Sequence, residues 1–273
     1  MIDLAPHNPH TLTITTPVIA AAGSLGDVVG VARWLGLTHP HSDHGLGAII
    51  SSTVTVAGRR GQPQMLATPA GLLYHHGNAS LSVKQVRERL APRWAGYHVP
   101  VLVSIAGAEA AAVAAALDGI AGVAGFEVAL PALTAAEAAQ RVAAVRRATL
   151  LPLIVRLPGE LPDPVAVAQA SIVAGADAIA LIGGLPACMP QADGQLVYGR
   201  LGGPAIFPLA LRMVAAVAAA VSAPVIGMGG VAAPDHARTM FHVGARAVAL
   251  ASALVTDLRR AKLIADAVGA SDR

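Results

Sequence analysis

Eight short apolar segments recur along the chain, and each is followed by a stretch of helix-forming residues. They lie at residues 17–24, 48–52, 101–104, 125–128, 153–156, 178–182, 225–226 and 247–252. Continuous apolar runs are typical of parallel strands that are buried on both faces. Because strands and helices alternate throughout, the pattern predicts an α/β fold, a single (β/α)8 TIM barrel. A short strand at residues 11–15 is expected to precede it as an N-terminal β element.

The length of 273 residues fits one such barrel, which needs about 250, so we expect a single TIM-barrel domain over residues 1–273. The most apolar run, residues 213–233, is interrupted by Pro224 and by glycines. A membrane-spanning helix needs about 20 uninterrupted apolar residues, so no span is predicted. Residues 1–4 show no signal-peptide pattern, and we expect a cytoplasmic location.

Charge and cysteine content exclude two further classes. The net charge is +3 and no long basic block occurs, which is too little for a nucleic-acid-binding surface. Cys188 is the only cysteine, so the chain has no disulfide framework.

Glycine turns follow the last two predicted strands. The seventh strand ends in Gly227-Met228-Gly229-Gly230, and the eighth ends in Ala251-Ser252. Such turns leave backbone N–H groups free next to the positive end of a helix, and barrels commonly bind phosphate after strands seven and eight. The pattern predicts a site for a phosphate-bearing ligand. The alternative is that the glycines serve only tight packing.

The other predicted strand ends carry small, weakly polar residues, and Arg156 is the only charged group expected among them. Chemistry in this fold takes place at these ends. An enzyme that moves protons usually places a His, Asp, Glu, Cys or Lys there.

Several stretches together resemble the dihydroorotate dehydrogenases, which are FMN-containing barrels, and most closely their bacterial heterodimeric class. They include Pro224-Val-Ile-Gly-Met-Gly-Gly230, and the others are residues 16–23, 47–55, 61–63, 67–73, 100–107, 174–177, 202–206 and 208–213. The resemblance implies an FMN-dependent oxidoreductase that converts dihydroorotate to orotate in pyrimidine biosynthesis. It also implies a homodimer and, in the heterodimeric class, an electron-transfer subunit with FAD and an iron–sulfur cluster.

The resemblance carries over to individual residues with several substitutions. It implies FMN contacts at Ala21, Ala22, Gly23, Ser52, Arg156, Gly202, Gly203, Gly229, Gly230, Ala251 and Ser252. Ser52 and Arg156 stand where the family has lysines, and arginine keeps the charge of lysine but not its shape. Ala251 replaces a preferred glycine. The substrate-binding asparagines are replaced by Tyr74, Ser104 and Gly183.

The largest departure from the family follows the fourth strand. There the family has a loop whose Cys or Ser removes the substrate's C5 proton, whereas here residues 126–133 lead almost directly into a helix that begins at Thr134. We therefore expect the family's reaction to be altered or lost. Replacement bases could come only from His75, His76 or Cys188, on loops of the same face. The alternative hypothesis is a non-catalytic homologue, a pseudoenzyme that serves ligand binding or assembly with a partner.

A separate motif, His-x-His-x-Asp-His, is formed by His39, His41, Asp43 and His44. It resembles the zinc-binding segment of metallo-β-lactamase-type hydrolases. That fold needs further ligands that the rest of the chain does not supply. A solvated polar loop is the expected structure, and a surface metal site is the alternative that stays open.

Overall fold

The predicted barrel is present in the computed structural model of the chain, which describes residues 1–75, 77, 79–191 and 193–269. Within these residues, parallel strands pair in the order β3–β4–β9–β10–β11–β12–β15–β16, and β3 pairs with β16 to close the barrel. The bounds of these strands are Val18–Ala20, Ala48–Ile50, Val101–Ala106, Gly125–Ala129, Leu153–Leu157, Ala178–Leu181, Val225–Met228 and Ala247–Leu250. Two short strands, β5 (Val54–Thr55) and β8 (Leu81–Ser82), extend the sheet beside β9.

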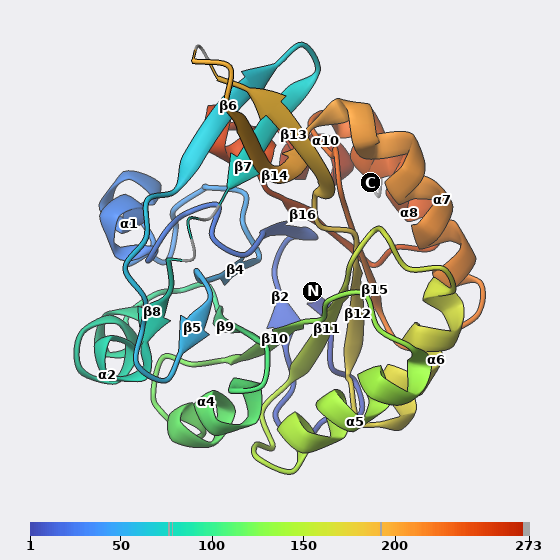
Figure 1. Cartoon of the computed structure of the whole chain (residues 1–273). Helices are drawn as coiled ribbons and strands as arrows, with labels where there is room; N and C mark the ends of the chain where they lie inside the picture. The colour runs from blue at the N-terminus through green and yellow to red at the C-terminus, as the bar shows by residue number, and fades with distance from the viewer. Residues whose placement is uncertain (76, 78, 192, 270–273) are drawn as a thin grey trace.

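Helices surround the barrel (Figure 1). They are α1 (Val29–Leu35), α2 (Val83–Gln85), the π-helical turn η1 (Val86–Leu90), α3 (Ala91–Trp94), α4 (Ala110–Leu117), α5 (Ala135–Arg146), α6 (Pro164–Val173), the 3-10 turn η2 (Pro204–Ile206), α7 (Phe207–Ala218), α8 (Pro234–His242), α9 (Ser252–Thr256) and α10 (Arg260–Gly269). Ser82 and Thr134 begin α2 and α5 with capping boxes, as expected for Thr134 from its sequence. Among the described residues, no helix combines the length and apolar character needed to cross a bilayer.

The apolar core has two layers because alternate residues of each strand point to opposite faces. Val103 and Val155 belong to the layer between the strands and the helices. Ile19, Ile154 and Ile226 point into the barrel and form the second layer. Strands β1 (Ile2–Asp3) and β2 (Thr13–Ile14) form the short N-terminal β element. Leu4, Ala5 and Leu12 between these strands, together with Ile14, pack against the inner layer and close the amino-terminal end of the barrel.

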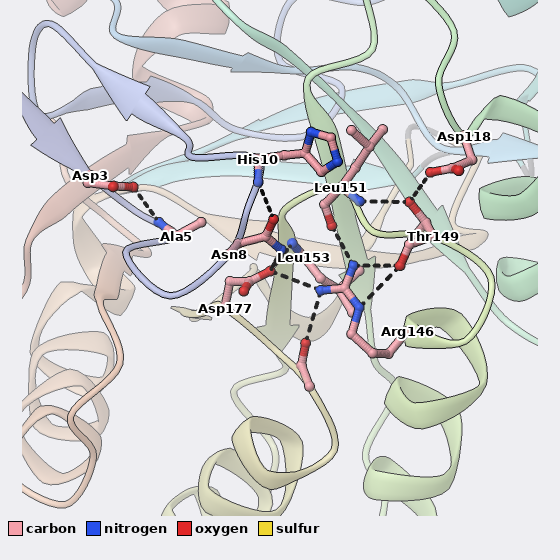
Figure 2. Close-up of polar contacts among 11 residues, drawn as sticks. Asp3, Ala5, Asn8, His10, Asp118, Arg146, Thr149, Leu151, Leu153 and Asp177 are labelled. Atoms are coloured by element: carbon pink, nitrogen blue, oxygen red, sulfur yellow. Dashed lines mark hydrogen bonds and ion pairs between the residues drawn. The ribbon is translucent and has the colours of Figure 1, made fainter.

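A polar network ties this N-terminal segment to the barrel (Figure 2). The Asp177 Oδ2 atom accepts hydrogen bonds from Asn8 Nδ2 at 3.0 Å, Arg146 Nη1 at 3.1 Å and the Leu153 backbone N–H at 2.8 Å. The Arg146 guanidinium also donates to the backbone carbonyls of Thr149 and Leu151. The network therefore joins the N-terminal segment, α5 and two neighbouring strands.

A four-stranded antiparallel sheet lies outside the barrel, in the order β13–β14–β7–β6. Its strands are Leu185–Pro190, Leu196–Gly202, Gly71–His75 and Gln64–Thr68. Figure 1 shows it projecting from the barrel at the top of the view. From the sequence, residues 56–78 and the stretch from the sixth barrel strand to about Gly203 are predicted as loops, and this prediction was wrong where these four strands form. Their pairing is non-local, with Arg200 opposite Tyr74, and Pro186, Pro190 and several glycines obscure the strand pattern.

Candidate functional site

Glycines of three loops meet at the carboxyl end of the barrel. Gly229 and Gly230 follow β15 with φ angles of 105° and 78°, in the left-handed region that favours glycine. A Cβ atom on Gly230 would lie 2.7 Å from the Gly203 carbonyl oxygen, and one on Gly203 would lie 2.6 Å from the Gly71 Cα atom. Neither position has room for a side chain, so the turn after β15, the end of β14 and the start of β7 pack backbone against backbone.

The neighbouring predicted cofactor residues come from the same rim. A Cβ atom on Gly202 would lie 3.9 Å from Ser252, which begins α9 directly after β16. His236 of α8 supports the turn, because its Nδ1 atom lies 3.1 Å from the Gly230 carbonyl oxygen and its ring stacks on Phe207 at 4.3 Å. Turn backbone of this kind, beside the start of a helix, suits a phosphate group. We call Gly202, Gly203, Gly229, Gly230, Ala251 and Ser252 the phosphate cradle.

The ends of β3 and β4 bring a second group of predicted cofactor residues together. Ala21 is buried and donates its backbone N–H to the Leu250 carbonyl of β16, and Ala22 and Gly23 follow it. A Cβ atom on Gly23 would lie 3.8 Å from the Ser52 Oγ atom. Ser52 itself donates to the Gly26 carbonyl at 2.9 Å. Small side chains therefore line this part of the rim, and Ser52 brings no charge where the family has a lysine.

A charged pair inside the barrel was missed by the sequence reading. Glu127 of β10 is fully buried, and its Oε1 atom accepts from Arg156 Nε at 3.1 Å and from Ser104 Oγ at 3.3 Å. Arg156 is thus not the only charged group near the rim. The inward position of Glu127 could have been predicted, because side chains alternate along a strand and Glu127 lies on the same face as Ala129. We call Ser104, Glu127 and Arg156 the interior triad.

Arg156 lies against the loop after β12. Its Nη1 atom would be 2.9 Å from a Cβ atom on Gly183, which explains why a glycine suits that position. Of the three predicted substrate residues, Ser104 therefore belongs to the triad and Gly183 adjoins it. The third, Tyr74, is in β7 opposite Arg200, where burial raises the pKa of its hydroxyl group.

The candidate replacement bases lie on the antiparallel sheet. Cys188 is exposed in β13, opposite Tyr198, and His75 ends β7 opposite Gln64. His76 lies outside the described residues. The assignment of a base to any of these residues stays a prediction.

The segment between β10 and α5 is as short as the sequence suggests. The Leu130 backbone N–H donates to the Arg156 carbonyl at 3.0 Å, so the chain stays close to β11 after the strand ends. Thr134 then caps α5, and its hydroxyl is engaged with Glu137 Oε2 at 2.7 Å. Residues 130–133 are Leu, Pro, Ala and Leu, and none of them carries a group that accepts a proton.

A cavity of about 320 Å³ opens where β5 and β8 meet the end of β9. Hydroxyl groups of Thr53, Thr55 and Ser80 line it together with Arg59 and Glu109. The last two form an exposed ion pair at 4.0 Å. The cavity thus offers polar groups to a small ligand close to Ser52, and sequence reasoning did not identify it.

The histidine-rich motif lies between α1 and β4. Asp43 pairs with Lys262 of α10, and His44 Nδ1 accepts from the Leu46 backbone N–H at 3.0 Å. Burial lowers the pKa of His44, and the charge of Asp43 opposes that shift. Across the described part of the chain, no group of three or more His, Cys, Asp or Glu side chains, including those of His39 and His41, is placed to hold a metal ion.

Comparison with known proteins identifies the family. The family model described as dihydroorotate dehydrogenase matches residues 7–270. Three relatives are named dihydroorotate dehydrogenase B (NAD(+)), catalytic subunit. The protein from Desulforudis audaxviator is 36% identical over 89% of this chain and 84% of its own length. The protein from Citrifermentans bemidjiense is 34% identical over 93% of this chain and 88% of its own length. The protein from Halalkalibacterium halodurans is 32% identical over 90% of this chain and 86% of its own length. The chain therefore belongs to the dihydroorotate dehydrogenase family.

Proposed function

We propose that the protein binds FMN at the carboxyl end of its barrel. The carrying observation is the phosphate cradle, in which Gly203 and Gly230 are buried with no room for side chains while Gly202, Gly229 and Ser252 stay partly exposed. Backbone contacts to phosphate need no particular side chain. They can therefore form even though Ala251 stands where the family prefers a glycine. Ser52 and Arg156 would face the ring, and bound FMN would supply a hydride acceptor.

We further infer that dihydroorotate is not oxidised by the family's route. Removal of the C5 proton needs a base within hydrogen-bonding reach. Residues 130–133 provide none, and the Thr134 hydroxyl is engaged in the capping box. Ser104 is buried and donates to Glu127. The proposal is therefore a flavin-binding relative whose original oxidation in pyrimidine biosynthesis is altered or lost. A cytoplasmic location and a single domain are part of this proposal.

A second candidate is a non-catalytic role in an assembly. Met65, Leu196 and Tyr198 all lie on the antiparallel sheet and are 48%, 51% and 66% exposed, and apolar side chains gathered on one exposed element are a feature of interaction surfaces. The relatives are named as catalytic subunits, which favours a partner subunit for this chain as well. A homodimer would cover the same kind of surface. Sedimentation of the purified protein distinguishes these states from a monomer.

Titration with FMN tests the proposed function. We expect the protein to be yellow as purified or to take up about one FMN per chain, seen as a change in flavin absorbance and fluorescence. A colourless protein that takes up no added FMN would contradict the proposal and leave the non-catalytic assembly as the better account.

A further inference from the structure

The interior triad is placed by the register of three neighbouring strands. Glu127 lies opposite Ser104 of β9, and Ala129 lies opposite Arg156 of β11. All three triad side chains share the inward parity of Leu102 and Ile154, which belong to the inner core layer. The triad is therefore a polar group inside an otherwise apolar barrel, just below its carboxyl end.

The contacts within the triad are unequal. Both hydrogen bonds go to Glu127 Oε1, whereas Glu127 Oε2 is buried and has no hydrogen-bond partner among the described residues. Arg156 uses its Nε atom for the ion pair, and its side chain is 21% exposed, while the side chain of Glu127 is 0% exposed. The carboxylate is thus the enclosed partner, and the guanidinium extends from it toward the rim.

The buried carboxylate of Glu127 is stabilised by its ion pair with Arg156. An isolated carboxylate in the interior would be strongly destabilised, and an ion pair with good geometry offsets much of that cost. The pair also restricts the guanidinium, because Nε is held by Glu127 and Nη1 lies against Gly183. As a result, Arg156 has a fixed orientation, and the charges of the pair sum to zero.

We propose that Glu127 is a positioning residue that orients Arg156 and cancels its charge at the site where FMN would bind. The inference rests on the proposed function. Reduction adds negative charge to a flavin, so a nearby cation without a counter-ion stabilises the reduced form more than the oxidised form. Because Ser52 replaces the other lysine of the family, the Glu127–Arg156 pair leaves this site without net positive charge. Glu127 therefore holds the reduction potential of the flavin low.

The test is the FMN midpoint potential of Glu127→Gln, measured by anaerobic dye equilibration. The change removes the negative charge but keeps the shape of the side chain. We expect reduced FMN to bind about tenfold more tightly relative to oxidised FMN, which is a rise of about 30 mV in the two-electron midpoint potential. The charge control is Asp118→Asn, which removes a carboxylate hydrogen-bonded to Thr149 at the other end of the barrel. This variant should change the ratio of the affinities for reduced and oxidised FMN by less than about twofold.

The possible outcomes separate the two proposals. If wild type and variant both bind FMN with the same potential, Glu127 does not set the charge of the site and the inference fails, while the proposed function stands. If wild type binds no FMN, both fail. Should the glutamine variant not accumulate as folded protein, Glu127→Ala removes the charge without leaving a buried amide, and the same rise in potential is expected. A purely structural role for Glu127 would lower thermal stability without raising the potential.

Discussion

Gly230 is the residue on which the proposed phosphate site depends most. Its φ of 78° favours glycine, and its surroundings exclude a side chain, because Gly203 and Phe207 backbone atoms lie 2.7 Å from a Cβ position. The glycine turn could be predicted from the sequence. The residues that pack against it could not, because they come from distant loops and from α7.

Gly230→Ala should weaken FMN binding by at least about tenfold, because the added methyl group forces the packed loops apart. A tenfold loss of affinity corresponds to about 1.4 kcal/mol of binding free energy. Gly119→Ala is the matched control. Gly119 has a φ of 69°, but a Cβ atom there would have nothing within 4 Å, so only the backbone preference is lost. Isothermal titration with FMN should show near-normal affinity for this control. Equal affinities for both variants would mean that the turn does not hold the cofactor.

The interior triad could not be predicted by considering each strand separately. Each strand was recognised from its apolar run, but Glu127 was read as part of the run rather than as an inward-facing acid. The substrate contact that the resemblance implies for Ser104 stays a prediction, and the structure adds that its hydroxyl donates to Glu127. The partner of a buried charge depends on strand register, which the sequence does not specify.

Among the elements, an ion pair links the antiparallel sheet to a connection of the barrel. Arg200 of β14 donates two hydrogen bonds to Glu160, at 2.9 and 2.8 Å, and one to the Gly184 carbonyl at 2.7 Å. Glu160 lies in the connection between β11 and α6. Burial raises the pKa of Glu160, but the hydrogen bonds and charge of Arg200 outweigh this, and the net pKa is lowered.

The stability that this pair gives to the sheet should depend on pH. Because the pKa of Glu160 is lower in the folded state, the contribution is complete above the pKa of the unfolded chain and is lost as the pH falls through the folded value. Glu160→Gln should increase amide exchange in β13 and β14 about fivefold near neutral pH, which corresponds to about 1 kcal/mol for a partly exposed pair. The difference from wild type should disappear in acid.

Asp235→Asn is the control for this measurement, since it removes an exposed ion pair with Arg238 on α8. Exchange in β13 and β14 should be unchanged by it. If Glu160→Gln leaves exchange in the sheet unchanged at every pH, the ion pair does not hold the sheet.

For the molecule as a whole, the barrel is predicted by the alternation of strands and helices. The N-terminal segment closes the amino-terminal end of this barrel. The sequence indicated a strand ahead of the barrel but not its role as a plug. The segment closes the barrel through its apolar residues, and it is held there by Asn8, which reaches Asp177 across 169 positions of the chain, and through Asp177 by Arg146 of α5. Such long-range contacts cannot be read from local patterns.

Arg146→Met should lower the free energy of unfolding by about 3 kcal/mol, because it leaves the mostly buried Asp177 without its cation. For a chain of this size, the melting temperature should fall by about 6–12 °C. Arg147→Met, the same change at the adjacent exposed arginine, should leave it nearly unchanged. Calorimetry of both variants checks the prediction, and equal melting temperatures would show that the network contributes little.

We propose that this barrel keeps a flavin site while lacking the family's base. Anaerobic mixing of the FMN-loaded protein with dihydroorotate tests it most directly, with absorbance followed at the flavin bands. We predict that the flavin stays oxidised with dihydroorotate and is bleached when dithionite is added. Rapid bleaching by dihydroorotate would contradict the account, because it would require a base that the segment between β10 and α5 does not contain.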